Sequence, residues 1–236
     1  MLTEVYRLEI PDNSAGWNTV AIPYSVNNAA ITLSGYTRVA YYLQLGTATN
    51  AFAQYVYVSF DVIPDLDTAI ELGVPSLGPN GSGKVIKSTV TNLRVFASGA
   101  AGVTSGVFPT GGNLEFWPSN YGAGANGRFD YDDDGFGASA GHASMQIHNG
   151  GLAETLIGYS AWGAARDSEL GVGIGPNPSG NATGPQPDWT FNTTNNDNFT
   201  VQTLQVFVQQ VPEPATIGLA LFGGAGLLMR RRRRAA

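Results

Sequence analysis

Short runs in which apolar and polar residues alternate are the feature that most limits what this chain can fold into. Residues 5–10, 38–45 and 53–62 follow this period of two and are rich in β-branched and aromatic side chains. No window of ten or more residues in this part of the chain has a clear helical period of 3.6. Alternation of this kind is typical of strands that bury one face. The sequence therefore predicts an all-β fold.

Turn-forming clusters of Gly, Asn, Ser and Pro separate these runs, and residues 47–50 predict a hairpin connection. Residues 65–73 predict about one helical turn. The other strand candidates are residues 17–24, 30–33, 84–97, 113–117, 143–148, 155–162, 169–174, 188–191 and 199–210. Many short strands in one chain predict a two-sheet sandwich of jelly-roll type. We expect residues 1–210 to form this single domain and residues 211–236 to form a separate segment.

The composition of residues 1–210 limits the partners of this domain. The chain has no cysteine, so an apolar core must supply the stability that disulfides give to some domains. Outside residues 211–236 there are 7 basic and 17 acidic residues, a net charge of −10. This charge argues against nucleic acid or an anionic membrane surface as a partner, and it is compatible with divalent cations.

Residues 211–236, VPEPATIGLALFGGAGLLMRRRRRAA, differ from everything before them. A Pro-Glu-Pro tripeptide precedes an uncharged apolar run over residues 215–229. As a helix this run would span roughly 22 Å, which is short of a hydrocarbon core of about 30 Å. A block of arginines follows and should stay on the cytoplasmic side. The order predicts a short transmembrane helix with an Arg-rich end, held only transiently in the inner membrane, with the rest of the chain outside.

This tail resembles the PEP-CTERM sorting signal of Gram-negative bacteria, which membrane proteases called exosortases recognise. The matching residues are Val211, Pro212, Glu213 and Pro214, the apolar run, and the arginines Arg230, Arg231, Arg232, Arg233 and Arg234. The resemblance implies recognition of the tripeptide, removal of the tail, and release or attachment at the cell surface. It also implies association with exopolysaccharide and biofilm matrix. An ordinary C-terminal anchor helix is the alternative.

Export requires an N-terminal signal peptide, and the first residues do not have that form. The chain opens MLTEVYRLEIPDNSAGW, in which Glu4, Arg7 and Glu9 interrupt any apolar run. We therefore expect Met1 to be an internal start, with the true N-terminus missing. A cytoplasmic protein that merely carries such a tail is the alternative.

Much of residues 1–210 also resembles a secreted bacterial module found beside carbohydrate-esterase domains. The segments that carry this resemblance are residues 38–43, 113–121, 144–149 and 187–191. The resemblance implies one structural unit across residues 1–210 and a carbohydrate-linked setting.

An acidic stretch is the candidate metal site. Asp130, Asp132 and Asp134, followed by Gly135, occupy positions 1, 3, 5 and 6 of a calcium loop. Position 12 is Gly141, where an EF-hand has a bidentate Glu, so an EF-hand is excluded. A loop bounded by strands could complete the calcium shell with carbonyl oxygens. A solvated acidic loop is the alternative.

Four aromatic residues next to turns are the candidate glycan-binding residues. They are Trp117, Tyr121, Trp162 and Trp189. An aromatic ring can stack on a sugar while neighbouring amides bind its hydroxyl groups. The alternative is that these rings cap the core of the sandwich. The first hypothesis would make the domain a carbohydrate-binding module, with or without calcium.

Enzyme-like motifs lack the surroundings that their chemistry needs. Residues 137–141 have the G-x-S-x-G form of a hydrolase, but a strand rather than a helix is expected to follow, and no histidine follows a later Asp. Residues 78–84 resemble a phosphate loop, but Val85 occupies the position of the metal-binding Ser or Thr. We therefore expect a non-catalytic domain.

The remaining candidate site residues are carboxylates spread along the sequence and two histidines. A glycan-acting hydrolase built on Glu115, Asp130 or Asp188 is the remaining enzyme hypothesis. His142 and His148 are expected on one strand, too far apart to share a metal ion, with His148 as a hydrogen-bonded strand residue.

Overall fold

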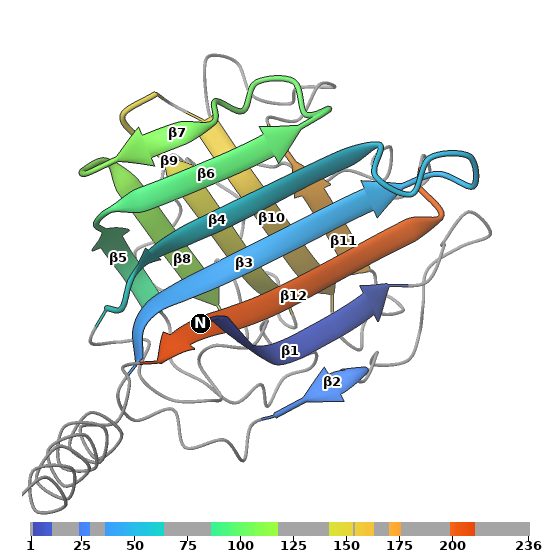
Figure 1. Ribbon diagram of the computed structural model, residues 1–236, viewed down its shortest axis with the longest axis horizontal. Helices are drawn as coiled ribbons and strands as arrows, with labels where there is room; N and C mark the ends of the chain where they lie inside the picture. Colours follow the sequence, from blue (N-terminus) through green and yellow to red (C-terminus); the bar gives the residue numbers. More distant parts are fainter. Residues whose placement is uncertain are drawn as a thin grey trace, which may run out of the picture.

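The computed structural model of the protein describes residues 2–10, 24–28, 36–63, 86–117, 142–152, 154–162, 170–175 and 199–210. In this part of the chain, twelve strands form two sheets, and every strand pair is antiparallel (Figure 1). The strands are β1 (Leu2–Ile10), β2 (Val26–Asn27), β3 (Tyr36–Gly46), β4 (Gln54–Asp61), β5 (Ile86–Val90), β6 (Leu93–Ser98), β7 (Gly106–Phe108), β8 (Gly112–Trp117), β9 (His142–Asn149), β10 (Glu154–Trp162), β11 (Leu170–Ile174) and β12 (Val201–Gln210).

The first sheet has seven strands in the order β2-β1-β12-β3-β4-β6-β7. The last strand of the chain therefore lies inside the sheet, between β1 and β3. The β3–β4 hairpin closes through a connection in which Thr47 N donates to Asn50 O at 2.8 Å. This confirms the predicted hairpin.

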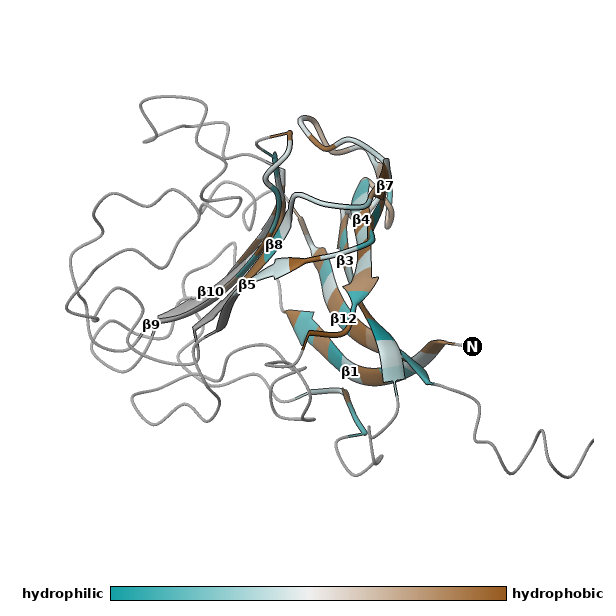
Figure 2. Ribbon diagram, turned by 90° about the vertical axis from the view of Figure 1, so that its left-hand side faces the viewer, coloured by the Kyte–Doolittle hydropathy of each residue, from teal (hydrophilic) through white to brown (hydrophobic). Residues whose placement is uncertain are grey.

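The second sheet has five strands in the order β11-β10-β9-β8-β5. It lies behind the seven-stranded sheet in Figure 1 and beside it as a separate layer in Figure 2. Strand β4 of the first sheet contacts β10 and β11 of the second.

The core fills the space between the two sheets. Every second residue of the central strands points inward and is fully buried, as in Val39, Tyr41 and Leu43 of β3. The inward residues Leu114 and Ile147 of the second sheet belong to the same apolar cluster. Each fully buried aliphatic side chain contributes about 1.5–3 kcal/mol. The alternation in the sequence therefore reflects a two-layer sandwich with a single core.

The all-β, two-sheet prediction is confirmed, and most of the predicted strands are present within two residues of their expected bounds. The short strands β2 and β7 were not predicted. The candidates at residues 30–33 and 188–191, most of 17–24, and the helical turn at 65–73 lie outside the described residues. The jelly-roll connectivity stays a prediction.

The single strand predicted over residues 84–97 is wrong, because the structure has two strands there. Residues 84–97 alternate as a single run, but the structure divides them between β5 in the five-stranded sheet and β6 in the seven-stranded sheet. Thr91 and Asn92 form the corner between the sheets, and Asn92 has a φ of 52°. Val90 and Leu93 are both in the core although they are three positions apart, so the alternation shifts by one residue across the corner.

Candidate functional site

The outward face of the seven-stranded sheet is the described surface with the clearest binding chemistry. Residues that alternate with the core-facing ones point to this face, and no described strand covers it (Figures 1 and 2). On the three neighbouring strands they are Arg38, Ala40, Tyr42 and Gln44 of β3, Tyr55, Tyr57, Ser59 and Asp61 of β4, and Arg94, Phe96 and Ser98 of β6. Aromatic rings therefore lie among hydroxyl, amide and charged groups.

Four of these side chains form an aromatic patch, defined as Tyr42, Tyr55, Tyr57 and Phe96. Tyr57 pairs in register with Phe96 on one side and with Tyr42 on the other, so three rings follow one line across the strands. The ring centroids of Tyr57 and Phe96 are 6.2 Å apart. The ring of Tyr55 lies beside the line, 6.1 Å from that of Tyr42. Phe96 is 57% exposed, so solvent reaches the patch.

Arg94 is the exposed cation next to the aromatic patch. It precedes Phe96 by two positions on β6, so both side chains point to the same face. Among ion pairs between described residues, Arg7 pairs with Glu4 and Arg38 pairs with Asp61, whereas Arg94 has no carboxylate partner. The guanidinium of Arg94 is therefore available to an anionic group that reaches the patch.

The opposite end of the line of rings is polar. Gln205 of β12 pairs in register with Tyr42, and its amide Nε2 donates to the carboxylate of Glu4. Arg7 Nε donates to the same carboxylate at 2.9 Å. Burial, and then the neighbouring Tyr55, raise the pKa of the Tyr42 hydroxyl, which stays protonated at neutral pH. The patch thus has hydrogen-bonding groups at both ends.

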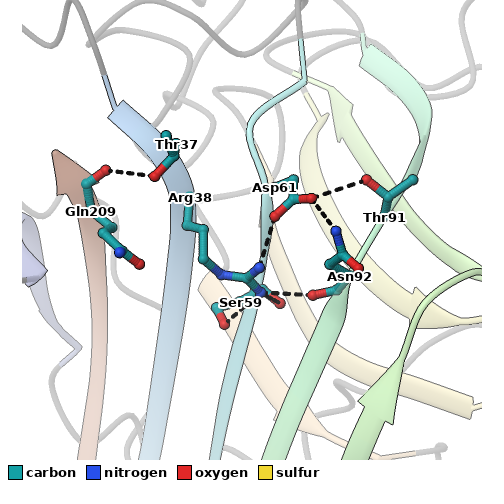
Figure 3. A network of polar contacts seen from close by, with 7 residues as sticks. All are labelled: Thr37, Arg38, Ser59, Asp61, Thr91, Asn92 and Gln209. Carbon is teal, nitrogen blue, oxygen red and sulfur yellow. Dashed lines mark hydrogen bonds and ion pairs between the residues drawn. The ribbon is translucent and has the colours of Figure 1, made fainter. Parts of the chain in front are cut away.

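Arg38 closes one edge of the face and fixes the corner between the two sheets (Figure 3). Its Nη1 donates to Asp61 Oδ1 at 2.8 Å, and its Nη2 donates to the carbonyl oxygens of Asn92 at 2.7 Å and Ser59 at 3.0 Å. Thr91 Oγ1 and Asn92 Nδ2 both donate to Asp61 Oδ2. Because Thr91 and Asn92 connect β5 to β6, this network stabilises the corner.

The electrostatics of this network also fit a structural role. Burial and repulsion from Arg94 lower the pKa of Arg38, whereas the Asp61 carboxylate raises it. The Arg38 side chain is 12% exposed and that of Asp61 is 36% exposed. A guanidinium stays charged after such a shift, so Arg38 remains a cation at neutral pH. Its donors are directed at the Asp61 carboxylate, at Ser59 and at the corner carbonyl of Asn92 rather than at solvent.

Two of the four predicted glycan-binding residues lie on described strands. The backbone of Trp117 pairs with Ser144, and that of Trp162 pairs with His142. Both tryptophans are therefore at the same end of the five-stranded sheet, on the strands that flank β9. The structure describes only the backbone of these two residues. Tyr121 and Trp189 lie outside the described residues. A glycan site formed by these four residues stays a prediction.

The predicted metal and hydrolase residues are not placed by the structure. Asp130, Asp132, Asp134 and Asp188 lie outside the described residues, and Glu115 is described only as a backbone position opposite Gln146. Within the described ranges, no group of three or more His, Cys, Asp or Glu side chains could hold a metal ion. The calcium and hydrolase hypotheses therefore stay predictions.

The two histidines lie on one strand, β9, as predicted. His148 is fully buried, and its Nε2 donates to Oε1 of Gln146 at 3.0 Å. The prediction of a hydrogen-bonded strand residue is confirmed. Across the neighbouring strands, His148 pairs in register with Asn113 and Thr155, which are also buried. This row is a polar layer on the five-stranded sheet.

The predicted sorting segment starts where the described chain stops. Strand β12 ends at Gln210, and residues 211–236 lie outside the description. Among the described residues there is no helix long and apolar enough to span a membrane. The predicted helix over residues 215–229 therefore stays a prediction.

A comparison with protein-family models identifies the tail. A model described as the PEP-CTERM protein-sorting motif matches residues 210–234. The chain carries a PEP-CTERM sorting motif. The PEP-CTERM motif implies export, membrane anchoring before processing, and processing by an exosortase. No curated protein and no solved structure matches the chain.

The aromatic patch was not predicted from the sequence, although part of its signal is visible there. Tyr55 and Tyr57 alternate with Val56 and Val58, which is the pattern of rings on one face and aliphatic side chains on the other. The position of Phe96 beside Tyr57 depends on the pairing of β4 with β6, which no local pattern reveals.

Proposed function

We propose that the protein is an exported cell-surface or matrix protein, processed by an exosortase, whose residues 1–210 form a non-catalytic β-sandwich. The PEP-CTERM motif at residues 210–234 carries this proposal. The motif starts where β12 ends, and β12 pairs with β1 on one side and β3 on the other. Cleavage beyond Gln210 would therefore leave the strand pairing of this sheet intact.

Each part of the tail has a role in this proposal. The exosortase recognises Pro212, Glu213 and Pro214, while residues 215–229 hold the protein in the inner membrane until cleavage. The arginines from residue 230 to residue 234 remain on the cytoplasmic side because charged side chains cross a bilayer at high cost. The exopolysaccharide matrix around the cell is the proposed destination.

Processing in cells tests this proposal. The chain, preceded by a secretion signal, is expressed in a host that has an exosortase and in the same host without it. The mass of the exported protein is then measured, together with its distribution between membrane and medium. We expect loss of the tail only in the host that has the exosortase.

A variant of the tripeptide serves as the matched comparison. Pro212→Ala, Glu213→Ala and Pro214→Ala together keep the apolar run and the arginines, so membrane insertion is preserved. We expect this variant to accumulate at full length in the membrane fraction. Equal processing of this variant and the unaltered protein, or processing in the host without exosortase, would contradict the proposal.

A further inference from the structure

The aromatic patch lies outside the residues of the sorting motif and outside the buried core. Its four rings occupy outward positions of β3, β4 and β6, opposite the buried positions of the same strands. Phe96 is among the most exposed large apolar side chains described. Exposed rings gathered on one face of a sheet are a common sign of a binding surface.

We propose that the aromatic patch binds an extended polysaccharide chain that lies across β6, β4 and β3. The line from Phe96 through Tyr57 to Tyr42 runs perpendicular to the strands. Neighbouring strands are about 4.8 Å apart and the ring centroids of Tyr57 and Phe96 are 6.2 Å apart, distances on the scale of one sugar residue in an extended chain. Successive rings can therefore contact successive sugars.

The chemistry of the rings and their neighbours favours a sugar. A pyranose has an apolar face that packs against an aromatic ring, and hydroxyl groups around its edge that need hydrogen-bond partners. The tyrosine hydroxyls of the patch and the half-buried amide of Gln44 supply such groups from the same face. Rings and polar groups therefore alternate over the patch, as a polyhydroxylated ligand requires.

A protein partner fits this face less well. The core of a protein–protein interface is depleted of charged residues and rich in apolar contacts. On β3, β4 and β6, the aliphatic side chain on the outward face is the small Ala40, while Arg94 and Arg38 border the rings. Of the other exposed apolar residues, Phe52 lies in the β3–β4 connection, and Val107 of β7 pairs in register with Arg94, so that it adds a single aliphatic side chain at the border of the patch.

Arg94 determines which sugars the patch prefers. Its guanidinium lies next to Phe96 and has no carboxylate partner among the described residues, although the protein as a whole is acidic. A uronic acid on the sugar next to Phe96 would meet this charge. Sugars of neutral and of acidic polysaccharides can both stack on the aromatic rings, but only the carboxylate of an acidic sugar can also pair with Arg94.

Affinity electrophoresis of the full chain tests the proposal. The native gels contain hydroxyethylcellulose, a neutral glucan, or alginate, a polyuronate, and a third gel contains no polysaccharide. We expect retardation by at least one of the two polymers. Tyr57→Ala and Phe96→Ala should each weaken binding up to about tenfold, the upper limit for one aromatic contact.

Phe52→Ala is the matched control, because Phe52 and Phe96 have the same side chain and nearly the same exposure, 59% and 57%. We expect Phe52→Ala to bind as the unaltered protein does. Melting temperatures of all variants are measured to show that each is folded. Equal losses in Phe52→Ala and Phe96→Ala, no effect of Tyr57→Ala, or no retardation of the unaltered protein by either polymer would overturn the proposal.

Two further measurements complete the test. If Arg94→Ala weakens binding to alginate alone, the patch recognises acidic sugars, whereas binding to each polymer that is unchanged from that of the unaltered protein assigns the patch to neutral pyranose rings. If Phe96→Ala instead converts a dimer into a monomer in sedimentation, the face is an interface between copies and the proposal is wrong. The inference is independent of sorting, because binding is measured without an exosortase.

Discussion

Asn92 adopts a left-handed backbone conformation at the corner between the two sheets, with a φ of 52°. Asparagine tolerates this conformation better than most residues because its short amide can form local hydrogen bonds. Here Nδ2 donates to Asp61, and the Asn92 carbonyl accepts from Arg38. The identity of this residue therefore sets where the chain leaves one sheet for the other.

Two substitutions of Asn92 separate the backbone effect from the hydrogen bond. Both Asn92→Gly and Asn92→Ala lose the contact with Asp61, but only alanine has a Cβ that opposes a positive φ. We expect Asn92→Ala to be less stable than Asn92→Gly by about 1 kcal/mol in urea unfolding.

The same pair of substitutions at Ser98 is the control, because Ser98 is an exposed strand residue without a positive φ. There we expect alanine to be at least as stable as glycine. A variant Asn92→Ala that is as stable as Asn92→Gly would show that the corner does not depend on the left-handed conformation.

Tyr41 makes stability depend on pH at the alkaline end. Burial, then Tyr24, Tyr36 and Tyr6, raise the pKa of its hydroxyl well above the ordinary value of 10.0. The unfolded chain therefore releases this proton first, so the free energy of unfolding is unaffected below about pH 9 and falls as pH rises past 10.

The variant Tyr41→Phe tests this dependence, because phenylalanine keeps the ring and removes the titrating group. We expect its free energy of unfolding to fall less steeply above pH 10, by about 1.4 kcal/mol per pH unit. The measurement is urea unfolding of both proteins at pH 8, 10 and 11. Parallel curves for the two proteins over this range would refute the assignment to Tyr41.

At the scale of the elements, strands β5 and β8 pair with each other while the β6–β7 hairpin between them belongs to the other sheet. The chain returns to the five-stranded sheet at Gly111, which has a φ of 92°, and Gly112. A Cβ on Gly112 would lie 2.5 Å from Val90 Cγ2 and 3.3 Å from Leu93 Cβ. Glycine therefore allows β8 to pass close to the corner formed by β5 and β6.

Gly112→Ala should destabilise the protein by about 1–3 kcal/mol through this overlap. Val90→Ala alone should also destabilise it, because Val90 is buried. In the double variant the smaller side chain makes room for the new methyl group, so we expect a loss smaller than the sum of the two single losses. Thermal or urea unfolding of the four proteins measures this coupling. Strict additivity would show that the two positions are not in contact.

The strands could be predicted from the sequence, but their partners could not. Alternation reveals a strand because burial alternates along it, and this holds for β3, β4 and β12 without any knowledge of the fold. Pairing depends on contacts between distant residues, such as Leu2 with Gln209. The corner at Asn92 was missed for the same reason, because each side of it has an alternating pattern that fits either sheet.

At the scale of the whole molecule, the candidate sites show the same division. The sorting motif was predicted because its order of residues is local, and a family model matches it. The aromatic patch was missed because its rings come from three strands, and only the registers of Tyr57 with Phe96 and Tyr42 bring them together. Adjacent Tyr41 and Tyr42 look equivalent in the sequence, although one is fully buried and the other lies on the outer face.

The position of β12 gives the last prediction, which concerns how the fold and the tail depend on each other. Because β12 pairs on both sides and buries Leu204, Val206 and Val208, its loss would leave one edge of β1 and one edge of β3 unpaired and expose the core. We expect a fragment of residues 1–210 to unfold cooperatively at the melting temperature of the full chain, and a fragment of residues 1–200 to show no cooperative transition. Circular dichroism during heating measures both.

A protein whose tail is removed after export needs this independence, since the sandwich must remain folded once residues 211–236 are gone. A cooperative transition in the shorter fragment would mean that the sheet closes without β12, and a much lower melting temperature in the longer one would mean that the tail stabilises the sandwich.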